Sequence, residues 1–139
     1  MADKFLLEIV TPQGVVLEEE VEEVAAPAQQ KGEFGVLKGH THFITTLAAG
    51  VVRYRAAGKD SHLAIAKGYA EVLPEKTIIL VDMARRAEEI DPAWAAEQFK
   101  AKEQALFGKT EEDPDYKELT DELILARAML TAAEAVKRK

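Results

Sequence analysis

The 139-residue sequence contains no cysteine, which excludes disulfide bonds and thiolate chemistry and is compatible with a reducing compartment. It has no apolar run near the ~20 residues that a membrane-spanning helix needs. Basic residues are outnumbered, with 18 Lys and Arg against 25 Asp and Glu, and they form no stripe that could neutralise phosphates. These absences argue against a disulfide scaffold, an integral membrane protein, a nucleic-acid-binding protein and direct attachment to an anionic lipid surface.

The start of the chain, Met-Ala-Asp-Lys, lacks the apolar core of a secretory signal peptide. Hydrophobic residues make up 47% of the sequence and charged residues 31%, as in a soluble globular protein. The length suits one domain, or a small domain with an appendage. Any association with a membrane should therefore come through a protein partner.

Enzymatic signatures are also missing, because the sequence contains no nucleophile–base arrangement, P-loop or dinucleotide fingerprint. This predicts a non-catalytic protein without a cofactor. One alternative is a small metal-dependent β-sandwich enzyme that uses His40, His42 and His62. Alternating residues of a strand lie on one face, but residues 43–47 supply no carboxylate to complete the ligand set. Surface or interface histidines are therefore the favoured interpretation.

Residues 1–86 have the pattern of short β-strands. Phe5, Leu7 and Ile9 alternate with Leu6 and Val10, which predicts a strand with one buried face. A change of phase between Val21 and Val24 indicates a bulge or turn near residues 22–23. Further short apolar runs, separated by glycine and proline, cover 44–48, 51–55, 62–66, 69–73 and 77–81. Such a series predicts a sandwich or a barrel.

Residues 87–139 have a helical pattern instead. Asp91 followed by Pro92 is a helix start, and Gly108 ends a helix predicted over 93–107. Asp113 and Pro114 repeat the start signal and predict a second helix. Its apolar stripe comprises Tyr116, Leu119, Leu123, Ala126, Leu130 and Ala133.

The two helices are predicted to form an antiparallel hairpin. Their apolar stripes are narrow and rich in alanine, and isolated helices of this length are marginally stable in water. Contacts with the rest of the protein must therefore hold the hairpin. The sequence leaves open whether it is attached loosely and can dock elsewhere, or is packed permanently on the sandwich.

Two charged clusters complete the pattern. The acidic run at residues 18–23 is interpreted as a solvated strand edge that discourages sheet aggregation. Arg85 and Arg86, at the junction of the two halves, could anchor the hairpin through exposed pairs worth at most ~1 kcal/mol each. Their expected partners are Glu88, Glu89 and Asp91.

The most distinctive segment is residues 32–40, where three glycines surround a short apolar stretch. Gly32 and Gly39 are interpreted as turns on either side of a strand at 34–37. Glu33 and His40 would then point to solvent at the tips of these turns. This arrangement is typical of a docking edge and lacks the parts of a catalytic pocket.

This segment, with Gly50-Val51-Val52-Arg53 after it, resembles the epsilon subunit of rotary (F-type) ATP synthases, bacterial type. Gly68 opens a run similar to the family's Gly-Gly-x-x-Glu-Val strand, with Tyr69 in place of the second glycine. Residues 5–12, 77–82 and 87–91 resemble the first strand, the last strand and the link to the helices. The resemblance implies a flattened β-sandwich of about ten strands over 1–86 and a C-terminal antiparallel two-helix hairpin over 87–139.

The resemblance also implies a function. Epsilon is a non-catalytic subunit of the central stalk that couples the catalytic head to the membrane rotor ring during proton-driven ATP synthesis. The sandwich would bind the gamma subunit and the c-subunit ring. The hairpin would inhibit ATP hydrolysis by extending to the alpha and beta catalytic subunits. The protein would be peripheral, on the cytoplasmic face of the bacterial inner membrane.

Carried over residue by residue, the resemblance gives a set of candidate contacts. The c-ring and gamma contacts are predicted at Gly32, Glu33, Phe34, Gly39, His40 and His42. Prolines common in the family are replaced by Lys38 and His42, so these turns should differ in stiffness and charge. The regulatory helix is predicted to act through Arg127, Lys137, Arg138 and Lys139.

One departure concerns nucleotide binding. Some bacterial epsilon subunits bind ATP through an Ile-Asp-x-x-Arg motif at the first helix. Here Ile90 and Asp91 are present, but Trp94 stands in the arginine position. An indole ring cannot grip phosphate with the paired donors of a guanidinium. The sequence therefore predicts no tight ATP site.

Overall fold

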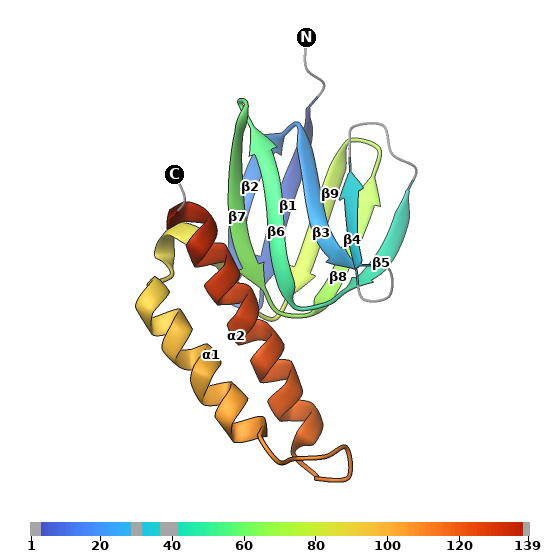
Figure 1. The fold of residues 1–139 in the computed structure, drawn as a ribbon. Coiled ribbons are helices and arrows are strands. Elements are labelled where there is room, and N and C mark those ends of the chain that lie inside the picture. Colours follow the sequence, from blue (N-terminus) through green and yellow to red (C-terminus); the bar gives the residue numbers. More distant parts are fainter. Residues whose placement is uncertain (1–3, 29–31, 37–41, 138–139) are drawn as a thin grey trace.

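The computed structural model describes residues 4–28, 32–36 and 42–137. Within this part, ten strands are followed by a 3-10 turn and two helices (Figure 1). The strands are β1 (Phe5–Thr11), β2 (Gly14–Val21), β3 (Glu23–Ala28), β4 (Gly32–Val36), β5 (Phe43–Leu47), β6 (Gly50–Ala56), β7 (Lys59–Ile65), β8 (Gly68–Leu73), β9 (Lys76–Val81) and β10 (Ala84–Arg86). The turn is η1 (Ala87–Glu89), and the helices are α1 (Pro92–Leu106) and α2 (Tyr116–Lys137).

The strands form one continuous sheet that folds into two layers. Their order is β10-β7-β6-β3-β5-β8-β9-β1-β2, with β4 paired to β3. Strands β1 and β9 run parallel, whereas the other pairs along this order are antiparallel. One layer holds β10, β7, β6 and β3, and the other holds β5, β8, β9, β1 and β2 (Figure 1). The predicted β-sandwich with a C-terminal helical hairpin is confirmed.

The alternation along β1 sets the core between the layers. Phe5, Leu7 and Ile9 are buried, while Leu6 and Val10 are only half-buried on the other face, as predicted. Apolar residues from both layers complete the core: Leu17, Val21, Val24, Leu47, Val52, Tyr54, Leu63, Ile65, Val72, Ile79 and Val81.

The phase change between Val21 and Val24 is produced by a bend at Glu22, which leaves both valines buried. The predicted turn is therefore confirmed. A bulge lies farther back in β2, because Ile9 pairs with Leu17 whereas Val10 pairs with Val15.

Arg86 has a role that the sequence did not predict. We expected it to hold the hairpin, but its Nη2 atom donates a 2.8 Å hydrogen bond to the carbonyl oxygen of Val16. Val16 is the residue of β2 that the bulge leaves without a partner in β1. The bond therefore links β10 and β2, the two end strands of the sheet order.

Helix α1 begins and ends where the local signals place it. The Asp91 side chain accepts a 3.1 Å hydrogen bond from the Ala93 amide, and Pro92 is the first helical residue. Gly108 follows the helix with φ +81°, a conformation that favours glycine.

The predicted start of α2 at Asp113 and Pro114 is wrong. Asp113 instead closes the loop before the helix, because its Oδ2 atom accepts a 2.8 Å hydrogen bond from the Thr110 amide. The side chain therefore points back into the turn, and the helix begins at Tyr116.

The hairpin is packed against the outer side of β6 and β7 through α2 (Figure 1). Small side chains form this contact: Ala64 of β7 is fully buried, and Ala128, Ala132 and Ala133 of α2 are buried with it. Ala87, Ile90 and Ala95 extend the same cluster toward α1. Alanine allows the helix and the sheet to approach closely, but each residue buries little apolar area.

Candidate functional site

The predicted docking segment is only partly described. Gly32 is the first residue of β4, opposite Ala28, so it lies in the strand and is not a turn. The sequence predicted a turn at Gly32, but pairing between β3 and β4 already includes Gly32, the first residue of β4. Glu33 and Phe34 follow in the same strand. Gly39 and His40 lie outside the described residues.

His42 lies just before β5 and is exposed. Its Nε2 atom is 3.3 Å from Oε2 of Glu71 in β8. His62 lies in β7, in the other layer of the sandwich, and His40 is outside the described residues. In the described part of the chain, His, Cys, Asp and Glu form no group of three suited to a metal ion. The alternative of a metal-dependent enzyme is unsupported.

Among the predicted regulatory residues, Arg127 has a defined contact. Its guanidinium carbon lies 5.5 Å from the centre of the Phe99 ring, a cation–π contact between α2 and α1. Lys102 and Glu122 also link the two helices, with 3.1 Å between Nζ and Oε1. Lys137 is the last residue of α2, and Arg138 and Lys139 lie outside the described residues.

A row of apolar side chains crosses the layer that α2 does not cover. Leu80 is paired with Tyr69 on one side and with Val10 on the other, and Val10 is paired with Val15. Paired residues of neighbouring strands point to the same face. Tyr69, Leu80 and Val15 are 57%, 46% and 63% exposed. We call Tyr69, Leu80, Val10 and Val15 the apolar row. The outward side of β5, β8, β9, β1 and β2 is called the open face.

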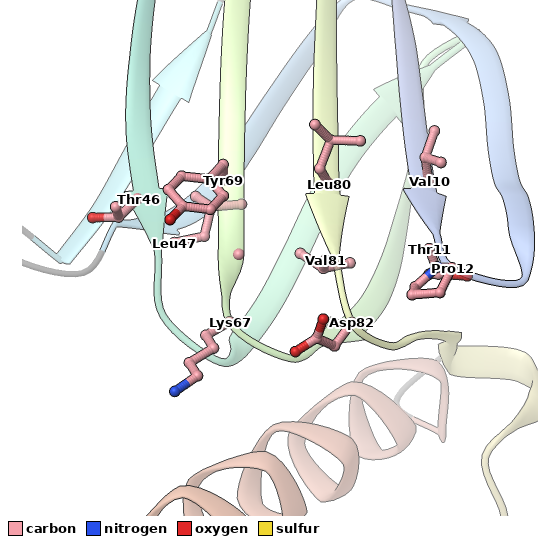
Figure 2. A pocket seen from close by; sticks show the side chains of 11 residues that line it. Val10, Thr11, Pro12, Thr46, Leu47, Lys67, Tyr69, Leu80, Val81 and Asp82 are labelled. Carbon is pink, nitrogen blue, oxygen red and sulfur yellow. The ribbon is translucent and has the colours of Figure 1, made fainter.

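Figure 2 shows Tyr69, Leu80 and Val10 on adjacent strands, above Lys67 and Asp82 at the strand ends. A groove of about 620 Å³ runs beside them and is also lined by Pro12, Thr46 and Gly68. Exposed apolar side chains gathered at a groove are typical of a surface for a macromolecular partner. Sequence reasoning missed this surface. The sequence feature that could have indicated it is that runs such as residues 5–10 and 77–81 have apolar residues on both faces of the strand.

Carboxylates lie beside the apolar row on the open face. Glu8 of β1 is directly opposite Glu18 of β2, and Ile78 separates Glu8 from Glu71. Lys76 Nζ lies 3.2 Å from Glu8 Oε1. Hydrogen bonding with Glu18 and with Lys76 lowers the pKa of Glu8. The hydrogen bond with Glu8 and the repulsion between the two carboxylates raise the pKa of Glu18.

A small cavity of about 160 Å³ lies where the first helix begins. Its lining includes Arg85, Glu89, Asp91 and Trp94. The indole of Trp94 thus occupies the wall where the resemblance would require an arginine. Two carboxylates and the guanidinium of Arg85 share this lining, so its charges partly offset one another toward a polyphosphate. That the chain has no tight ATP site stays a prediction.

Comparison with known proteins identifies the family. Residues 4–87 match the family model described as "ATP synthase, Delta/Epsilon chain, beta-sandwich domain". The ATP synthase epsilon chain of Geobacter metallireducens is 42% identical over 130 residues, which cover 94% of this chain and 92% of that relative. The ATP synthase epsilon chain of Geotalea uraniireducens is 40% identical over 141 residues, covering 99% and 100%.

A solved structure shows the same fold. A chain of the Euglena gracilis mitochondrial ATP synthase, in a structure of OSCP, F1 and the c-ring, superposes with a TM-score of 0.74 at 23% identity. The match covers 96% of this chain and 81% of that one. Within the described residues, neither helix has the length and apolar character to cross a bilayer.

These matches confirm the resemblance drawn from the sequence and the prediction of a non-catalytic subunit. Because the family match spans more than half of the chain and the curated relatives align over nearly all of it, this protein belongs to the ATP synthase delta/epsilon family, as a member of the epsilon type.

Proposed function

We propose that this chain is the epsilon subunit in the central stalk of a bacterial-type ATP synthase. It would couple the catalytic head to the membrane rotor ring during proton-driven ATP synthesis, and it would inhibit ATP hydrolysis through its C-terminal helices. The proposal is supported by relatives of this name that match nearly the whole chain. The complex is membrane-associated, and we place this subunit at its cytoplasmic face.

One observation carries the mechanism: α2 covers β6 and β7, while the open face stays exposed with its apolar row. We assign residues 1–86 to binding the gamma subunit and the c-subunit ring. A sandwich whose end strands are bonded together suits the transmission of torque, because it can turn as one body. We assign residues 87–139 to regulation.

For the c-ring we retain the segment predicted from the sequence. Its candidate contacts are Gly32, Glu33, Phe34, Gly39, His40 and His42. The acidic Glu33 would complement basic and polar groups on the loops of the ring. His42 already pairs with Glu71, so a c-ring loop would meet this pair rather than a free imidazole.

The hairpin is proposed to be a two-state element. Alanines form much of its contact with the sandwich, and a Lys67–Asp121 pair of 3.7 Å between exposed side chains adds at most ~1 kcal/mol. Reversing a 1:99 population takes ~5.5 kcal/mol of differential binding, which contacts with the alpha and beta catalytic subunits could supply. Extended, the hairpin would present Arg127, Lys137, Arg138 and Lys139 to them.

The proposal is tested by expressing the chain with and without residues 87–139 in its own ATP synthase. The shortened chain should still co-purify with the gamma subunit and support ATP synthesis, and ATP hydrolysis should rise because the inhibitory element is gone. A cysteine at Glu33 should crosslink the full chain to the c-ring. Loss of gamma binding on removing the hairpin would contradict the division of labour.

A further inference from the structure

The open face combines two kinds of surface. The apolar row runs across four strands, and Ile44 of β5, 65% exposed, lies in the neighbouring row of residues, opposite Glu71. Beside this surface lie four glutamates, which we call the acidic strip: Glu8, Glu18, Glu20 and Glu71. Among the described residues, Lys76 is a basic group of this face, and His42 and Lys67 lie at its edges. The face therefore carries an apolar row with negatively charged side chains beside it.

We propose that the open face docks a protein segment that lays apolar side chains over the apolar row and places an arginine or lysine side chain against Glu18 and Glu8. This inference rests on the proposed function and deepens it, because it gives the chemistry by which the stalk partner is recognised. Its central residues, Glu8, Glu18 and Leu80, are not among the predicted c-ring contacts, although His42 of that set pairs with Glu71 at the edge of the open face.

The position of Glu18 favours a cationic partner. Like charges directly opposite on neighbouring strands repel, yet Glu8 and Glu18 occupy such a pair. Lys76 contacts Glu8 through Oε1 and lies on the β9 side of it, away from Glu18. A guanidinium or ammonium group from outside would offset the repulsion between the two carboxylates. A guanidinium could also contact both of them, because it presents paired donors.

The same charges argue against other occupants of this face. A second copy docked face to face would bring two acidic strips together, and the whole chain has a net charge of −7. An anionic membrane surface would repel the strip in the same way. The hairpin of the chain itself is packed on β6 and β7. A basic and apolar segment of another protein fits both parts of the surface.

The test measures binding of the full chain to the gamma subunit of its own ATP synthase at several salt concentrations. Glu18→Lys should weaken binding about tenfold or more, and Glu18→Gln less, with a smaller dependence on salt in both. Leu80→Thr should weaken binding without changing the salt dependence. Glu97→Lys, which makes the same charge change on the exposed side of α1, should bind as the unaltered chain does.

The outcomes separate the two proposals. Thermal melting shows first that each variant folds, and Glu18→Gln keeps the test valid if the lysine variant does not. If the unaltered chain binds gamma and Glu18→Lys binds it equally well, the docking proposal is wrong while the function stands. If the unaltered chain does not bind gamma at all, the proposed function fails. The docking proposal would also be overturned if the unaltered chain formed a dimer that Glu18→Lys abolished. Binding of the chain to anionic vesicles through the open face would overturn it as well.

Discussion

Arg86 donates a hydrogen bond of 2.8 Å from Nη2 to the carbonyl oxygen of Val16, 70 positions earlier in the chain. The bond joins β10 to β2, which stand at opposite ends of the strand order. Val16 is also the residue that the bulge in β2 leaves unpaired. A single side chain therefore bonds to the bulge and links the two end strands of the sandwich.

Replacing Arg86 tests whether its hydrogen bond to Val16 stabilises the sandwich. Arg86→Met keeps most of the apolar stem but removes the donor, so it should lower the free energy of unfolding by about 1.5–3 kcal/mol, the range for a hydrogen bond that involves a charged group. Urea denaturation measures the difference. Arg85→Met is the matched control, because Arg85 is exposed, and it should cost less than about 0.5 kcal/mol. Equal losses in both variants would show that the bond to Val16 contributes nothing specific.

Gly68 is required by the close approach of β8 to β9. A Cβ atom at this position would overlap the carbonyl oxygen of Leu80 and come within 2.9 Å of the Val81 Cα. Gly68→Ala should therefore cost about 2–3 kcal/mol of stability, because main-chain atoms must move. Gly35→Ala in β4 is the control, because a Cβ atom at Gly35 would lie 3.9 Å from its nearest neighbour, the main-chain oxygen of Val24. Thermal denaturation should separate the two variants clearly.

Thr77 of β9 is buried, and its hydroxyl has no hydrogen-bond partner among the described residues. An unpaired buried hydroxyl is unfavourable, and valine has nearly the same shape without it. Thr77→Val should raise the free energy of unfolding by about 1 kcal/mol. Thr46→Val, at an exposed position of β5, should change it little. A loss of stability in Thr77→Val would mean that the hydroxyl is satisfied in solution.

Local signals in the sequence predicted much of this fold. The alternation of Phe5, Leu7 and Ile9 identified the buried face of β1, and Asp91 and Gly108 marked the two ends of α1. These features depend on neighbours a few residues away. The packing of α2 on β7 through alanines was not decided by the sequence, because an alanine-rich stripe suits several partners equally.

What the sequence did not predict depends on contacts between distant residues. The bulge at Val16 is seen only when the register between β1 and β2 is known, and the role of Arg86 follows from that bulge. The apolar row requires the register of four strands at once. Asp113 looked like a helix cap, but its side chain had a competing donor in the Thr110 amide.

The nucleotide prediction is tested at Trp94. Calorimetric titration of the full chain with ATP should show no binding in the micromolar range, because the cavity offers an indole and two carboxylates near Arg85. Trp94→Arg supplies a guanidinium at the motif position and should increase any ATP affinity. Trp94→Phe, which adds no donor, is the control. Micromolar binding by the unaltered chain would contradict the prediction.

The hairpin contact is tested at Ala132, which is fully buried between α2 and the sandwich. Leucine at this position needs space that the packed helix and sheet do not leave, so Ala132→Leu should displace the hairpin. Hydrogen exchange of the α1 and α2 amides should then accelerate about tenfold, while the amides of β6 and β7 keep the slow exchange of a paired strand.

The control for this variant is Ala101→Leu, which adds the same atoms on the exposed side of α1 and should leave exchange unchanged. In the assembled ATP synthase, a hairpin released by Ala132→Leu is free to extend, so ATP hydrolysis should fall if the extended state is the inhibitory one. Faster exchange together with unchanged or increased hydrolysis would separate undocking from inhibition. The regulatory assignment of residues 87–139 would then be wrong, even though the docking contact itself had been located correctly.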